Sequence, residues 1–137
     1  MSRSQYVDAL DQDELARWRG AVTRAIRGRR GQAFLRELIR ALETMAEKRL
    51  ISGALEDDSD VCAIGAVGRC RGMDMSRIDY EDPIAVAAAF GIAHAMAAEI
   101  EYENDEAEWR AESPEERWER MRRWAVKHLV AEAPEAP

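Results

Sequence analysis

Apolar residues recur at helical spacing along most of the chain, and polar residues fill the positions between them. Leu15, Trp18, Val22 and Ile26 form the first such stripe. It predicts a helix over 11–26, which starts at the capping residue Asp11 and ends at the "GRRG" of 28–31. The second stripe predicts a helix over 32–46 with Arg36 and Arg40 outside its apolar face. That face comprises Phe34, Leu35, Leu38, Ile39, Leu42 and Met45.

The pattern breaks after the second helix and resumes as a short third one. Leu50, Ile51 and Leu55 precede an acidic turn, which allows at most one short β-hairpin between 50 and 61. "VCAIGAVGRCRG" (61–72) then predicts a short helix. Gly65 and Gly68 weaken this helix, so we expect another backbone to pack closely against it.

The last three helices have clear start or stop signals. Asp82 followed by Pro83 predicts a helix that runs to Phe90 and stops at Gly91. The next is expected over 92–103. Ser113 to Glu116 form a capping box that begins a final helix, ending near 130. The fold class expected is therefore all-α, with a single compact domain of five to six helices over 1–131 and a disordered tail over 132–137.

The stripes also predict which side chains form the core. We expect the core to contain Trp18, Leu38, Leu42, Ile64, Phe90, Ile100, Trp118 and Trp124. Cys62 and Cys70 are eight residues apart in a predicted helix, about 12 Å, which is too far for a disulfide. We expect both to be buried structural thiols, with reactivity or redox use as the alternative.

Composition places the chain among ordinary globular proteins. Of its 137 residues, 47% are hydrophobic and 34% charged, which argues against intrinsic disorder. It has no apolar run of about 18 residues and no secretory signal at its start, so a cytoplasmic location without membrane attachment is expected. The net charge of −7 conceals a segregation of charge: residues 17–49 carry +7 and residues 51–116 carry −13.

The segment "AVAAAFGIAHAMAAEIEYENDE" (85–106) has the outline of a helix-turn-helix. A recognition helix needs Arg, Lys, Asn or Gln to reach base edges and phosphates. The second helix here has no Arg or Lys, and its carboxylates, which we expect to be exposed, would repel a phosphate backbone. We therefore expect this helical pair to be a packing unit that does not read DNA.

Two charged segments are candidate partner-binding sites. The first is a basic patch over 17–30, in which "GRRG" opens a helix whose N-terminus favours anions; its candidate residues are Arg24, Arg27, Arg29 and Arg30. The second is an acidic run whose candidate residues are Glu101, Glu103, Asp105, Glu106, Glu108 and Glu112. Charge blocks of this kind more often mark solvated helix faces than binding sites, and the basic patch also suits an acidic protein surface.

No segment predicts an enzyme. The sequence lacks a phosphate-binding GxxxxGK[ST], an HExxH, a GxSxG and an EF-hand loop. His94 and His128 stand without the spacing of metal ligands, so neither a metal nor a cofactor is expected.

Several stretches resemble small proteins of bacteriophages and prophages with no assigned activity. They are "VCAIGAVG" (61–68), "EIEYENDE" (99–106), "RGAVTRAIRGRRGQAFLREL" and "SPEERWERMRRWA". The resemblance implies a phage or mobile-element setting and carries no catalytic residue to this chain.

Two functions follow from these observations. The first is a non-catalytic accessory protein that binds a host protein or protein–nucleic-acid complex through charge, for example a counter-defence inhibitor such as an anti-CRISPR. The alternative is an accessory protein that binds nucleic acid through the basic patch.

Overall fold

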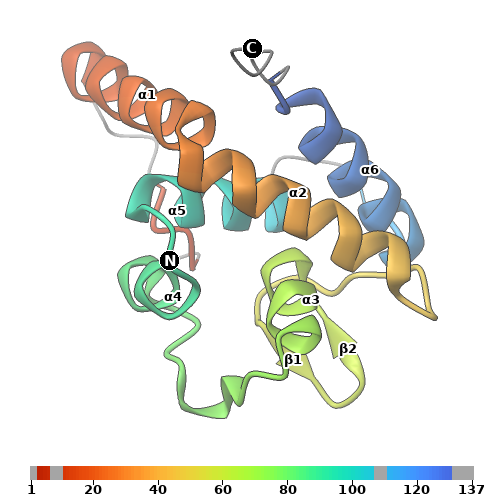
Figure 1. Ribbon diagram of the computed structural model, residues 1–137. Coiled ribbons are helices and arrows are strands. Elements are labelled where there is room, and N and C mark those ends of the chain that lie inside the picture. Colours follow the sequence, from red (N-terminus) through yellow and green to blue (C-terminus); the bar gives the residue numbers. More distant parts are fainter. Residues whose placement is uncertain (1–2, 7–10, 107–110, 131–137) are drawn as a thin grey trace, which may run out of the picture.

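The computed structural model describes residues 3–6, 11–106 and 111–130. Within these ranges it contains six α-helices and one short two-stranded antiparallel hairpin, so the predicted helical fold is confirmed (Figure 1). The disordered tail expected over 132–137 lies outside the described residues.

The helices begin close to their predicted capping residues. They are α1 (Gln12–Arg27), α2 (Arg29–Thr44), α3 (Ala63–Cys70), α4 (Pro83–Phe90), α5 (His94–Asp105) and α6 (Pro114–Lys127). Asp11, Asp82 and Ser113 each accept a hydrogen bond from a backbone N–H of the helix that follows, as predicted. The hairpin pairs β1 (Glu56–Asp57) with β2 (Asp60–Val61), and a short 3₁₀ helix, η1 (Met75–Arg77), precedes α4.

The prediction that 28–31 separates the first two helices is wrong. Only Gly28, in an extended conformation with ψ 166°, lies between α1 and α2. At Gly31 a Cβ atom would collide with the carbonyl oxygens of Ala25 and Ile26. The two helices therefore turn within one residue and pack closely at their junction, which places Arg29 and Arg30 on the first turn of α2.

The apolar faces of the helices meet in one hydrophobic core. α2 crosses the middle of the molecule and packs against α1, α3 and α6 (Figure 1). Of the predicted core residues, Trp18 and Trp118 are half-buried against the core; the others are buried, namely Leu38, Leu42, Ile64, Phe90, Ile100 and Trp124.

One residue of the first stripe and one of the cysteines are exposed. Leu15, which was not among the predicted core residues, is 47% exposed because the first two turns of α1 extend past the body of the protein (Figure 1). The prediction that both cysteines are buried is wrong for Cys70. Cys70 is exposed because it ends α3 at the surface, whereas Cys62 is buried and its Sγ caps α3 by accepting a hydrogen bond from Gly65 N. Both thiols are free.

The glycines of α3 permit the close packing that was expected. At Gly65 a Cβ would collide with the carbonyl oxygen of Leu55, at the start of the hairpin. At Gly68 it would collide with the side chain of Met75. The hairpin and η1 can therefore press directly against α3.

The α4–α5 pair has the sharp bend of a helix-turn-helix, 111° at the break that contains Gly91. Within the described residues no single helix is long and apolar enough to cross a membrane, and α4 and α5 pass that test only together, as a bent pair.

Candidate functional site

The acidic run was expected to be an exposed surface, and for most of its members this is wrong. Glu101 is completely buried, whereas Glu103, Asp105 and Glu112 are partly buried. Glu106 is exposed, and Glu108 lies outside the described residues. Exposure was predicted wrongly because the arginines that cover these carboxylates belong to other segments; Arg3, for example, is 102 positions from Asp105.

The N-terminal segment 3–6 provides part of this cover. Arg3 is 5% exposed and donates two hydrogen bonds to the carboxylate of Asp105, at 2.6 and 2.9 Å. Ser4 donates to Glu106 at 2.6 Å, and the hydroxyl of Tyr6 donates to Glu99 at 2.8 Å. These bonds tie the N-terminal segment to α5.

This environment shifts the pKa values of Glu101 and Asp105 in opposite directions. Burial raises the pKa of Glu101 to about 8, and the nearby guanidinium of Arg3, 3.6 Å away, only partly offsets the effect. Burial also acts to raise the pKa of Asp105, but its hydrogen bonds from Arg3 lower that pKa below its ordinary value overall. At neutral pH the pair therefore holds one buried proton and one buried negative charge.

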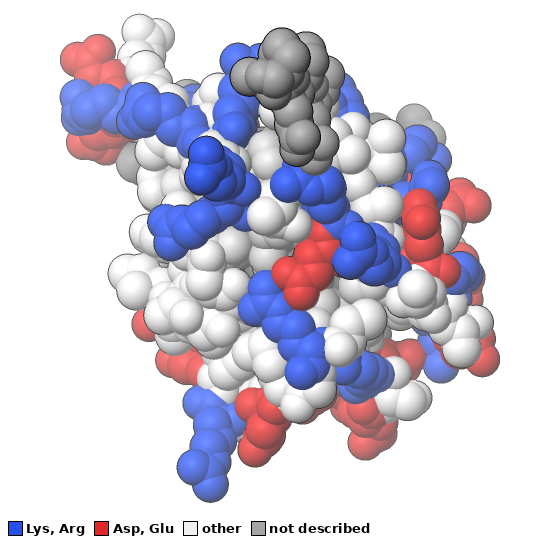
Figure 2. Space-filling model, viewed as in Figure 1, with Lys and Arg blue, Asp and Glu red and all other residues white. Residues whose placement is uncertain are grey.

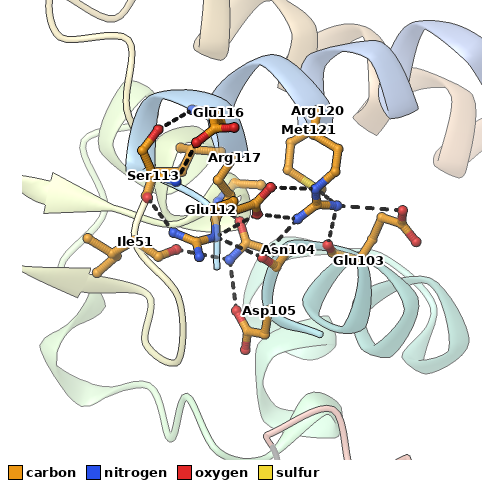
Figure 3. A network of polar contacts seen from close by, with 12 residues as sticks. Ile51, Glu103, Asn104, Asp105, Glu112, Ser113, Glu116, Arg117, Arg120 and Met121 are labelled. Atoms are coloured by element: carbon orange, nitrogen blue, oxygen red, sulfur yellow. Dashed lines mark hydrogen bonds and ion pairs between the residues drawn. The ribbon is translucent and has the colours of Figure 1, made fainter. Parts of the chain in front are cut away.

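The end of α5 and the start of α6 are joined by a second polar network (Figure 3). Arg120 donates to the carboxylate of Glu112 at 2.7 and 3.0 Å and to the carbonyl oxygen of Glu103 at 2.6 Å. Arg117 donates to the carbonyl oxygen of Asn104 at 3.1 Å. The arginines of α6 thus satisfy the last carbonyl groups of α5, which have no partner inside their own helix.

Asn104 connects the same network to the loop before the hairpin and to α3. Its side-chain amide donates to the carbonyl oxygen of Ile51 at 2.9 Å, and its oxygen accepts from Ala63 N at 3.1 Å (Figure 3). Ser113 and Glu116 form the predicted capping box. Most of the acidic run therefore holds helices together, and little of its charge is available to a partner.

Burial also explains why α5 is unsuited to enter a DNA groove. Every residue from Ala95 to Glu101 is buried. The predicted exposure of Glu99 and Glu101 is therefore wrong, whereas the lack of Arg and Lys on this helix is unaffected. That the helix does not read DNA remains an expectation.

The predicted basic residues are arranged very differently. Arg24, Arg27, Arg29 and Arg30 are all exposed and lie around the junction of α1 and α2. None of their guanidinium groups makes an ion pair or hydrogen bond with any residue that the structure describes. Figure 2 shows Lys and Arg gathered over this part of the molecule with few acidic residues among them. We call these four arginines the basic face.

Two hollows flank the last turn of α1 within the basic face. The first, of about 300 Å³, is lined by Arg24, Ala25, Ala93 and residues 28–31. The second, of about 210 Å³, lies between α1 and the end of α6, and its charged lining comprises Arg19, Arg27 and Lys127. The end of α1 is therefore a ridge with a cationic hollow on each side.

Two helices begin at the first hollow without a capping side chain. Gly28 precedes α2 and Ala93 precedes α5, and neither provides a side-chain hydrogen bond to its helix. The other four α-helices that the structure describes all have such a bond. The positive ends of two helix dipoles thus add to the charge of the arginines.

A buried glutamine fixes the second hollow. Gln32 is 5% exposed, and its amide nitrogen donates to the carbonyl oxygens of Ile26 and His128, at 2.8 and 3.1 Å. Its amide oxygen accepts from Val130 N at 2.9 Å. One side chain therefore holds the end of α6 against the end of α1, which keeps Lys127 beside Arg27.

The acidic residues of α2 do not cancel the basic face. Arg71 donates two hydrogen bonds of 2.7 Å to Glu37, and these bonds lower the pKa of the carboxyl. Glu43 accepts from Arg122. Sequence reasoning missed Lys127 as a neighbour of the patch. Its four-residue spacing from Arg123 on the exposed side of α6 was the available signal.

Another hollow, of about 350 Å³, lies elsewhere, between the end of α2, β2 and α3. Its lining is mainly apolar, and its arginines are already occupied. Arg49 pairs with Asp60 at 2.8 Å, and Arg69 donates to the carbonyl oxygens of Asp58 and Ser59. Unpaired charge lies at the basic face, which is therefore the better candidate site.

No arrangement for metal binding accompanies either region: among the residues described, no three His, Cys, Asp or Glu side chains are grouped so as to hold a metal ion. No protein family, curated protein or solved structure matches this chain. Function is therefore inferred from the geometry of the basic face.

Proposed function

We propose that this protein is a non-catalytic accessory protein that binds the phosphate backbone of nucleic acid through the basic face. The observation that carries the proposal is the state of Arg24, Arg27, Arg29 and Arg30, which are exposed and have no internal ion pair among the described residues. Phosphate contacts by arginine supply most of the affinity of sequence-independent nucleic-acid binding.

The setting of these arginines supports the same function. The uncapped N-terminus of α2 adds backbone N–H groups and a positive dipole end beside Arg29 and Arg30. The acidic residues nearest to them on α2, Glu37 and Glu43, are paired with arginines of other elements. A phosphate that approaches this face therefore meets arginines that are not neutralised by a carboxylate of the described residues.

Binding of a partner through the acidic run is less well supported. Glu101 is inaccessible, and Glu103, Asp105 and Glu112 are held by arginines of other segments. A partner that used them would have to break these contacts. An inhibitor of a host complex, such as the phage resemblance suggests, would therefore use the basic face as well, against nucleic acid or an acidic protein surface.

The experiment is a titration of a fluorescent DNA duplex of about 20 base pairs at about 50 mM salt, followed by anisotropy. We expect the triple variant Arg27→Glu/Arg29→Glu/Arg30→Glu to weaken binding roughly tenfold or more, because it removes three phosphate contacts and adds repulsion. A pair of single variants provides the matched control: Arg30→Glu reverses one charge within the basic face, and Arg77→Glu reverses one charge outside it. Arg77 is an exposed arginine of η1, outside the basic face, and its reversal should leave the affinity unchanged.

Unlabelled poly-glutamate, which represents an acidic protein surface, is added as a competitor of the labelled duplex. We expect it to displace the duplex only at much higher charge concentration than unlabelled DNA does. Displacement at equal charge concentration would assign the basic face to an acidic protein. If the wild type does not bind the duplex at about 50 mM salt, where electrostatic binding is strong, the proposed function is wrong.

A further inference from the structure

The basic face has cations on both sides of the last turn of α1, whose inner side is buried against the core and whose outer side is exposed. Arg24, Arg29 and Arg30 line the hollow on one side of the last turn of α1. Arg27 and Lys127 line the hollow on the other side, and Lys127 comes from α6. A flat basic patch would bind any polyanion. A ridge between two cationic hollows instead favours a partner that has a groove with negative charge along both of its edges.

Resting on the proposed function, we infer that the partner is a double-stranded nucleic acid, whose groove receives the end of α1 while each hollow faces the phosphates of one strand. An α-helix with its side chains is about 10–12 Å across, which matches the major groove of B-DNA at about 12 Å. The two strands that border the groove then run beside the two hollows.

The residues on this surface favour backbone contact over base recognition. Single-strand binding proteins stack bases on exposed aromatic rings. Here Trp124 is buried, Trp18 is half-buried, and the ring of His128 packs on that of Trp124 with 4.6 Å between centroids. The lining of the two hollows contains no Asn or Gln, the side chains that most often pair with adenine. Its arginines can pair with guanine, but in the inferred arrangement they face the phosphates. We therefore expect binding to duplexes to be independent of sequence.

The spacing between the two sides is fixed by the protein itself. Gln32 bonds the end of α1 to the end of α6, and Gly31 permits the tight junction of α1 with α2. The cations of the two hollows are thus carried by three helices whose ends are held together, and the ridge is preformed for a partner with two parallel rows of phosphates.

The test compares the salt dependence of binding for a duplex and for one of its strands alone. The variants are Arg30→Gln in the first hollow, Lys127→Gln in the second and Arg77→Gln as the control outside both. Each lost phosphate contact reduces the slope of log K against log salt by about 0.9 on duplex DNA and about 0.7 on a single strand. On the duplex, we expect Arg30→Gln and Lys127→Gln each to reduce the slope by about that amount.

On the single strand, we expect at most one of the two substitutions to change the slope, because one strand occupies one hollow. Equal losses for both variants on both nucleic acids would overturn the duplex inference. So would a duplex slope that Lys127→Gln leaves unchanged. In either case the effect of Arg30→Gln on duplex binding would still support the proposed function, which fails if the wild type does not bind the duplex at about 50 mM salt.

Discussion

At the scale of single residues, the cluster of Arg3, Glu101 and Asp105 shows how the protein accommodates charge in its interior. Asp105 takes both hydrogen bonds from Arg3, whereas neither oxygen of Glu101 has a hydrogen-bond partner among the described residues. A buried carboxylate without hydrogen bonds is costly, so the protonated form of Glu101 is favoured. The two carboxyl groups should therefore make the free energy of unfolding depend on pH in opposite ways.

Glu101 should make the protein less stable as the pH rises. Its pKa is about 8 in the folded protein and 4.5 ordinarily, so the folded state holds the proton more tightly between these values. The free energy of unfolding should therefore fall from about pH 4.5 to about pH 8. Glu101→Gln should lie within about 1 kcal/mol of the wild type at pH 5 and exceed it at pH 8. Urea unfolding at both pH values measures this, and parallel pH profiles for the two proteins would contradict it.

Asp105 should have the opposite effect. Its pKa is lowered in the folded protein, so its contribution is present above the ordinary value of 3.8 and is lost as the pH falls below it. Asp105→Asn leaves the buried guanidinium of Arg3 without its charged partner, and we expect a loss of about 3 kcal/mol at pH 7. Urea unfolding at pH 7 measures it; a loss below about 1 kcal/mol would show that Arg3 finds other partners.

At the scale of elements, the junction of α1 and α2 depends on one glycine. Gly31→Ala should destabilise the protein by about 3 kcal/mol, because the added methyl group meets the carbonyl oxygens of Ala25 and Ile26. Gly20→Ala is the matched control within α1. There the methyl group meets only the flexible side chain of Arg24, and the change should be neutral or stabilising by up to about 1 kcal/mol. Thermal unfolding of both variants tests the pair, and equal effects would contradict the close packing at Gly31.

The elements were largely predictable from sequence, and the charged contacts were not. Caps such as Asp11, Asp82 and Ser113 act on N–H groups within three residues, so a local pattern identifies them. The bond between Arg3 and Asp105 joins residues 102 positions apart, and no local signal reveals it. The same reason explains why the acidic run looked exposed. The basic patch was predictable as a set of residues. Its hollows were not, because the first depends on Ala93 and the second on the end of α6, which only the fold brings beside α1.

At the scale of the whole molecule, charge is separated in space. The basic face lies at the α1–α2 junction, while many exposed acidic residues lie on the hairpin and the segment around η1; these are Glu56, Asp57, Asp58, Asp74, Asp79 and Glu81. Figure 2 shows acidic residues toward the lower part of the same view. A protein of net charge −7 can therefore still attract a polyanion, but in one orientation only.

The most direct measurement of the central claim is the slope of log K against log salt for duplex binding between about 50 and 200 mM salt. One phosphate contact from each of the four arginines of the basic face and one from Lys127 predict a slope of about −4.5 for the wild type. Removing three of the arginine contacts in Arg27→Gln/Arg29→Gln/Arg30→Gln should leave a slope of about −1.8. A wild-type slope near zero, or a triple variant with the wild-type slope, would show that these arginines do not carry the function.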